Sequence, residues 1–172
     1  TSLIILGYIA IRFKPIFGAA AVIALVHDLL VSLGIFVVLG RSVTLEIVSA
    51  LLIVLGYSVN DTIVTFDRIR EIMANSYGRP MREMINEGIN RTLSRTVFTS
   101  GTTLIAVLSM LFFGGAGLKD FALILLLGIL SGTYSSVFIA SAIIDSYMLR
   151  KERKVGAAKA HGQVKTVRVG AQ

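Results

Sequence analysis

Four long apolar segments dominate the 172-residue chain. A helix needs about 20 apolar residues to cross the hydrocarbon core of a bilayer, and helices satisfy their own backbone hydrogen bonds there. The pattern therefore predicts an all-α polytopic membrane protein with four full spans. The expected spans are Pro15 to about Leu39, Val43 to about Phe66, about Thr96 to Phe113, and about Leu118 to Met148.

Composition supports this class of protein and excludes several others. Hydrophobic residues make up 55% of the chain and charged residues only 16%, whereas soluble domains carry about a quarter charged residues. The chain has no cysteine, and its two histidines, His27 and His161, lie far apart in sequence. Disulfides and thiolate metal sites are thereby excluded, and we expect neither a metal nor a cofactor.

The two ends of the chain differ from the spans. Residues 1–14 are apolar up to Phe13 but too short to cross a bilayer, and they lack the basic start and cleavage site of a signal peptide. We expect this segment to be the end of a truncated transmembrane helix, so that the chain is a fragment. Residues 15–149 would form the helix bundle. Residues 150–172 would form a basic, disordered cytoplasmic tail.

Positive charge is distributed unevenly between the connections. The loop between the second and third spans carries six arginines and the tail seven lysines and arginines, whereas the two short connections carry one positive residue each. By the positive-inside rule, the loop and the C-terminus are cytoplasmic. The same rule accounts for the net charge of +7, so that we expect the lipid bilayer and no nucleic acid as a partner.

Within that loop, residues 81–93 have the spacing of an amphipathic helix, which we expect at the cytoplasmic membrane surface. Its apolar positions are Met81, Met84, Ile85, Ile89 and Leu93.

Two charged residues mark the predicted membrane interior. Asp61 lies 18 residues after Val43 and Arg95 lies 19 residues before Gly114, which places both about 27 to 28 Å from the outer ends of their helices. Because neighbouring spans run antiparallel, an ion pair is predicted, and protonation of Asp61 would break it. The alternatives are a carboxylate that reaches the inner interface and a snorkelling arginine.

Asp61 and Arg95 are thus candidates for a proton relay, and further polar residues within the spans are candidates for its support or for hydrogen bonds between helices. For His27 and Asp28, near the middle of the first span, the alternative is a structural hydrogen bond to a neighbouring helix. The set of supporting candidates is His27, Asp28, Asn60, Thr62, Thr99 and Thr103.

Small residues at four-residue steps in the last span, Gly128, Gly132 and Ser136, predict close helix packing. The sequence contains no nucleophile–base pair, phosphate-binding glycine loop or dinucleotide fingerprint. We therefore expect no enzymatic activity and no ATPase motor.

Several motifs, in this order and spacing, resemble the SecF family of bacterial protein-export subunits over residues 1–150. They are Val26–Asp28, Gly56–Glu71, Asn90–Thr96, Thr99–Thr103 and Ser131–Ser136.

The resemblance implies an RND-type bundle that pairs with SecD, associates with the SecYEG channel and other Sec accessory subunits, and resides in the bacterial inner membrane. It implies that the subunit helps to export preproteins with the proton-motive force, and that Asp61 and Arg95 belong to the proton pathway. Relative to that family, the first helix, the periplasmic domain and most of the second helix are missing. A fragment of a proton-driven RND-type small-molecule exporter and a non-conducting structural subunit remain as alternatives.

Overall fold

The computed structural model describes residues 15–76, 79–147 and 149–150. These residues are helical apart from short connections, and they contain no strand. Four helices are long and apolar enough to cross a membrane, which confirms the predicted all-α polytopic bundle. The elements are α2 (Pro15–Val38), α3 (Leu45–Asn75), α4 (Met81–Phe113), α5 (Gly115–Tyr134) and its continuation η1 (Ser135–Ala140), a π-helical segment. The predicted truncated helix at 1–14 and the tail beyond residue 150 lie outside the described residues.

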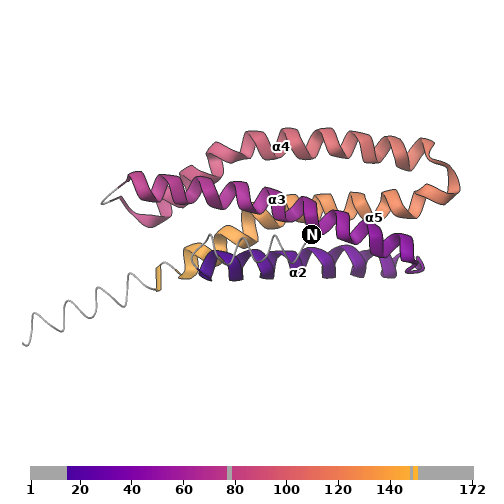
Figure 1. Ribbon diagram of the computed structural model, residues 1–172, viewed down its shortest axis with the longest axis horizontal. Coiled ribbons are helices and arrows are strands. Elements are labelled where there is room, and N and C mark those ends of the chain that lie inside the picture. Colours follow the sequence, from indigo (N-terminus) through magenta and orange to yellow (C-terminus); the bar gives the residue numbers. More distant parts are fainter. Residues whose placement is uncertain (1–14, 77–78, 148, 151–172) are drawn as a thin grey trace, which may run out of the picture.

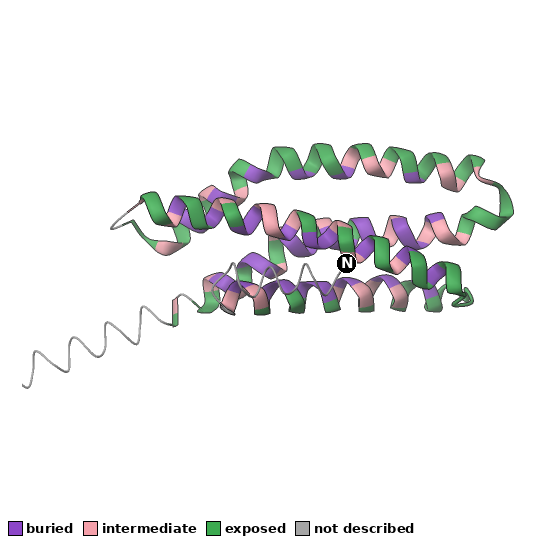
Figure 2. Cartoon of the chain, viewed as in Figure 1, coloured by how far each residue is buried: buried purple, intermediate pink, exposed green. Residues whose placement is uncertain are grey.

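The helices lie side by side, with α3 and α5 between α2 and α4 (Figure 1). Both central helices pack against α2 and against α4. Helix α5 is the most enclosed, with half of its most apolar window buried, whereas the corresponding share of α4 is 17%. Much of α4 is therefore exposed, above all on the side that faces away from α3 and α5 (Figure 2).

Two tight turns lie at one end of the bundle. Gly40, after α2, has a φ of 72°, and Gly115, at the start of α5, has a φ of 71°. Glycine adopts this left-handed conformation without the steric penalty that a Cβ atom brings. Arg41 Nη1 lies 3.0 Å from Asp120 Oδ1, so that an ion pair joins the α2–α3 turn to the first turns of α5.

At the other end, the helices are longer than the hydropathy pattern predicts. Helix α3 continues to Asn75, beyond the expected end near Phe66. Residues 81–93, expected to form a separate surface helix, are the first part of α4, because no proline or glycine separates them from the third span. Their apolar face packs on the extension of α3, where Ile69 and Ile85 are both buried in one core cluster.

Helix α5 approaches α3 closely where its side chains are smallest. A Cβ atom on Gly128 would lie 2.2 Å from Val54 Cγ2, and one on Gly132 would lie 3.1 Å from Ser58 Cβ. These glycines permit a spacing that larger residues would prevent. The polar side chains described next lie along this contact.

Candidate intramembrane proton site

Asp61, on α3, is held by hydroxyl groups from two other elements. Thr96 Oγ1, on α4, donates a hydrogen bond of 2.8 Å to Oδ1, and Ser136 Oγ, on η1, donates one of 2.6 Å to Oδ2. The side chain is half-buried. Both carboxylate oxygens are thus engaged by neutral donors, at the point where three helical elements meet.

The structure does not bring Asp61 and Arg95 together. Arg95 is exposed on α4, and no ion pair within the described residues joins it to Asp61. The predicted depth is nevertheless close, because the next residue, Thr96, contacts Asp61. Successive residues on a helix point about 100° apart, so that Thr96 faces α3 while Arg95 faces outward. The similar depths of Asp61 and Arg95 therefore did not determine the direction in which the Arg95 side chain points.

A second carboxylate, Asp28 on α2, is completely buried. Ser58 Oγ donates a hydrogen bond of 2.5 Å to Oδ2 and Ser135 Oγ one of 2.7 Å to the same atom, while Ser131 Oγ donates one of 3.0 Å to Oδ1. His27 Nδ1 lies 3.2 Å from Oδ1. Burial of a carboxylate is unfavourable unless its hydrogen-bonding capacity is satisfied, and here donors from α3, α5 and η1 satisfy it.

Helical spacing explains why these serines meet on Asp28. Ser131 and Ser135 are four residues apart and therefore lie on the same helix face. Gly132, between them, leaves room for α2 and α3, since a Cβ atom there would lie 3.6 Å from Asp28 Oδ2. The structure thus places the intramembrane candidate Asp28 in a hub that links three helices.

The two carboxylates are connected by neighbouring residues. Ser135 bonds to Asp28 and Ser136 bonds to Asp61, and these serines are the first two residues of η1. Each serine oxygen also lies 3.2 Å from a carbonyl of its own helix, that of Gly132 for Ser135 and that of Thr133 for Ser136. Single π-helical turns within α-helices are frequent at functional sites. Ser135 lies in the Ser131–Ser136 motif of the sequence, but it was not among the candidate site residues.

The remaining candidates are placed less centrally. Thr99 and Thr103 donate hydrogen bonds to carbonyls of their own helix, at 2.8 and 2.9 Å, and Asn60 is exposed. Thr62 is buried, and its hydroxyl has no hydrogen-bond partner among the described residues. Sequence reasoning missed a link between α3, α4 and α5. It is made by Tyr57, Ser100 and Thr133, with oxygen separations of 3.1 and 2.8 Å.

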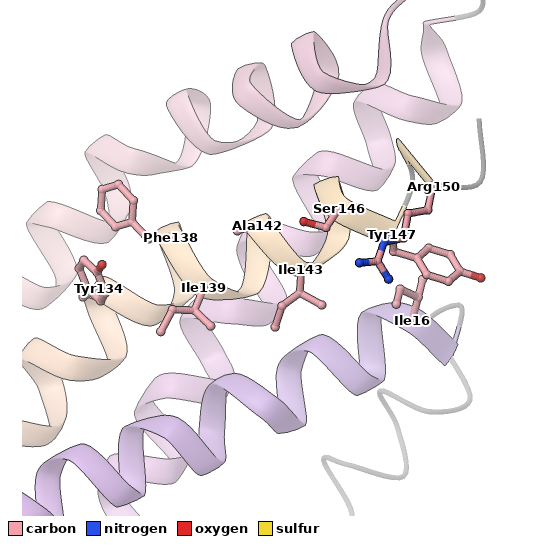
Figure 3. Close-up of a pocket in the computed structure, with 9 residues that line it drawn as sticks. All are labelled: Ile16, Tyr134, Phe138, Ile139, Ala142, Ile143, Ser146, Tyr147 and Arg150. Carbon is pink, nitrogen blue, oxygen red and sulfur yellow. The ribbon is translucent and has the colours of Figure 1, made fainter. Parts of the chain in front are cut away.

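The described residues contain no group of three or more side chains suited to metal binding. A groove with a volume of about 560 Å³ lies between the start of α2 and the stretch from Tyr134 to Arg150 (Figure 3). Apolar side chains such as Ile16 and Phe138 line most of it, and Arg150 lies at one end. Neither carboxylate contributes to the groove, so that the chemistry of the bundle is concentrated in its interior.

Four spanning helices that enclose hydroxyl-bonded carboxylates define a multi-pass helical membrane protein with an ionisable network between its spans. Residues 1–150 match the family model described as "Protein export membrane protein SecD/SecF, C-terminal". The chain belongs to this SecD/SecF family.

Individual relatives agree with this assignment. The chain is 51% identical over 145 residues to "Protein translocase subunit SecF" of Desulfurispirillum indicum, a match that covers 83% of this chain and 46% of the relative. It is 44% identical over 149 residues to "Protein translocase subunit SecDF" of Thermus thermophilus, with 87% of this chain and 20% of that protein covered. The chain therefore spans about half the length of the SecF relatives that it matches, or less.

A solved structure shows the same fold. The crystal structure of SecDF in a super-membrane-facing form matches with a TM-score of 0.86 and 42% identity, over 91% of this chain and 21% of that one.

Proposed function

We propose that this chain is part of a Sec translocase subunit that helps to drive export of preproteins across the bacterial inner membrane with the proton-motive force. Its relatives carry the names of protein translocase subunits, which supports a transport component rather than a catalyst. The observation that carries the proton-driven role is the hydroxyl-bonded Asp61 between α3, α4 and η1.

A change in the protonation of Asp61 would alter how these elements hold together. The ionised carboxylate accepts one hydrogen bond from Thr96 and one from Ser136. When a proton binds to Oδ2, that atom becomes a donor, and the hydrogen of Ser136 can turn to the carbonyl oxygen of Thr133, 3.2 Å away. Uptake of one proton would thus weaken the attachment of η1 to α3.

Arg95 is assigned to the same relay through movement of α4. It neighbours Thr96, so that a rotation of α4 by about 100° would direct the guanidinium toward Asp61 in place of the hydroxyl. In this proposal, the bonded and rotated arrangements of α4 alternate as Asp61 gains and loses its proton. Such an alternation is a physical route from proton passage to helix movement.

The exposed side of α4 is the proposed contact surface for a SecD-type partner. It combines large apolar side chains, among them Phe98 and Ile105, with the exposed Arg95 and Thr102. Polar and charged side chains toward the middle of a bilayer are unfavourable against lipid and favour contact with protein or water. The fusion of both subunits in the SecDF relatives is consistent with such a pairing. The proposal also includes contact with the SecYEG channel, with other Sec accessory subunits and with the translocating preprotein. It further places the C-terminus in the cytoplasm.

The test uses the full-length gene product with its SecD-type partner in proteoliposomes under an imposed pH gradient. Asp61→Asn is expected to reduce both proton flux and completion of preprotein transport at least tenfold. Asp67→Asn, which changes an exposed carboxylate on the same helix, is the matched control and should retain both.

The outcome also separates the alternatives. Normal flux and transport in Asp61→Asn and in Arg95→Lys, with normal assembly, would contradict the relay and favour the structural subunit. Proton flux that expels a small molecule but moves no preprotein would favour the small-molecule exporter.

A further inference from the structure

We propose that Asp28 is a second proton-binding carboxylate, and that its protonation is coupled to that of Asp61 through Ser135 and Ser136. The inference rests on the proposed function, because it adds Asp28 to the same relay. It assigns a role to the most enclosed ionisable side chain of the bundle, which lies on a different helix from Asp61.

The surroundings of Asp28 satisfy its hydrogen bonds without a permanently charged partner. All three side chains that donate to it from other elements are neutral serines, and none of the described ion pairs brings a lysine or arginine to it. A buried carboxylate held by three hydroxyl groups and one histidine can exist in two forms: an anion that accepts all of these hydrogen bonds, or an acid that accepts some and donates one. Such a site can change its charge, and the direction of the surrounding hydrogen bonds changes with it.

Few other ionisable groups lie near the middle of the helices around Asp28. They are His27 on α2, Tyr57 and Asp61 on α3, Tyr134 at the end of α5, and Asp145, which follows η1. Arg95 faces outward from α4. Of these groups, only His27 directly contacts Asp28 in the described residues. Asp61 is the other carboxylate held by the same helical turn, η1.

His27 provides a route by which a proton reaches the buried carboxylate. Its side chain is 35% exposed, whereas that of Asp28 is 0% exposed, and the two are 3.2 Å apart. An imidazole that has taken up a proton from its exposed side can pass the Nδ1 proton to Oδ1. The N–H bond breaks as the O–H bond forms, and histidine and aspartate both become neutral.

Ser135 and Ser136 transmit the change in charge between the carboxylates. Each serine has one hydroxyl hydrogen and two acceptors for it, a carboxylate oxygen and a carbonyl oxygen of its own helix. When Asp28 loses its charge, the hydrogen of Ser135 can turn from Oδ2 to the carbonyl oxygen of Gly132. Ser136 makes the equivalent choice between Asp61 and Thr133. The two serines share a peptide bond at the start of a π-helical turn, so that a shift of one changes the position of the other.

The coupling can be measured by infrared titration of the full chain in lipid vesicles. The carbonyl band of each protonated carboxyl group is assigned by its loss in Asp28→Asn or Asp61→Asn. We expect Asp28→Asn to displace the titration midpoint of Asp61 by about one pH unit. Because linkage between two sites is reciprocal, Asp61→Asn should displace the midpoint of Asp28 by the same amount in the same direction. The double substitution Ser135→Ala and Ser136→Ala should remove most of this mutual effect.

Two results would overturn the inference. One is an Asp28 band that never appears as the pH falls to the limit of the folded state. The other is an Asp61 midpoint that is the same with and without Asp28. If Asp28→Asn fails to fold, Ser135→Ala alone is the second variant, and unchanged midpoints of both carboxylates would then contradict the coupling. The titration needs no export activity, so that its outcome is distinguishable from loss of the proposed function, which the flux assay on Asp61→Asn reports.

Discussion

Ser136 Oγ donates a 2.6 Å hydrogen bond to Asp61 Oδ2, which attaches the π-helical turn of the last span to the middle of α3. The contact joins residues 75 positions apart in the chain. From the sequence, Ser136 was predicted only as a small residue that permits close helix packing.

Replacement of this serine by alanine tests the contact directly. Ser136→Ala removes the donor to Oδ2, and a hydrogen bond to a charged group contributes about 1.5–3 kcal/mol. We expect a lower thermal midpoint of unfolding and a several-fold loss of proton flux in proteoliposomes. Ser109→Ala is the matched control, because Ser109 is exposed and bonds only to the carbonyl of Ile105 in its own helix. Equal behaviour of the two variants would contradict a special role for Ser136.

Gly128 is predicted to be indispensable for steric reasons. An added Cβ atom would lie 2.2 and 2.5 Å from the two methyl groups of Val54, and overpacking of this kind costs about 1–3 kcal/mol. Gly128→Ala should therefore destabilise the bundle, as measured by thermal unfolding in detergent.

Two further variants identify the cause. Gly101→Ala should have little effect, because nothing lies within 4 Å of the atom that it adds. Val54→Ala combined with Gly128→Ala should recover part of the lost stability, since it removes the methyl groups that clash. A double variant no more stable than the sum of its parts would show that the clash is not the cause.

His27→Phe is expected to slow protonation of Asp28. Phenylalanine retains an aromatic ring beside the carboxylate but cannot carry a proton. After a rapid fall in pH, the Asp28 carbonyl band should rise about a hundredfold more slowly than in the unmodified chain, the lower end of the effect of one proton-transfer group. An unchanged rate would show that protons reach Asp28 by another route. The band of Asp61 in the same sample is the internal control.

Membrane orientation can be tested with single cysteines, because the chain has none of its own. Ser42→Cys places a thiol at an exposed position in the α2–α3 turn, and Ala116→Cys places one at the exposed start of α5. Asn75→Cys places a thiol at the exposed end of α3. By the positive-inside rule, a membrane-impermeant maleimide added outside intact cells should label the first two and spare the third. Labelling of Asn75→Cys alone would reverse the proposed orientation.

Hydropathy predicted the spans because the transfer of a helix into the bilayer depends on the residues of that helix alone. Each helix must be long and apolar enough for the bilayer, and this property is carried by consecutive residues. The end of α3 and the start of α4 were harder to predict. They lie beyond the long apolar segments and are stabilised by packing in the core cluster that contains Ile69 and Ile85. The helix at 81–93 was expected from its pattern, but its continuity with the third span was not.

The candidate site was predicted in part. Distance along a helix placed Asp61 and the region around Arg95 at similar depths, and Thr96 does contact Asp61. Which of two consecutive residues faces the partner depends on the rotation of α4, which the packing of all four helices sets. The hydrogen-bond donors to Asp28 could not be predicted from the sequence for a related reason. They come from residues 58, 131 and 135, and only the folded bundle brings them together.

The ion pair between Arg41 and Asp120 has a consequence for how the bundle deforms. It fastens the α2–α3 turn to α5 at the end where the two glycine turns also keep consecutive helices close. Helices tied at one end act as levers, and a small change of angle near the tie produces its greatest displacement at the far tips. The extended ends of α3 and α4 are those tips, so that any change of angle between the helices would displace the arginine-rich end of the molecule most.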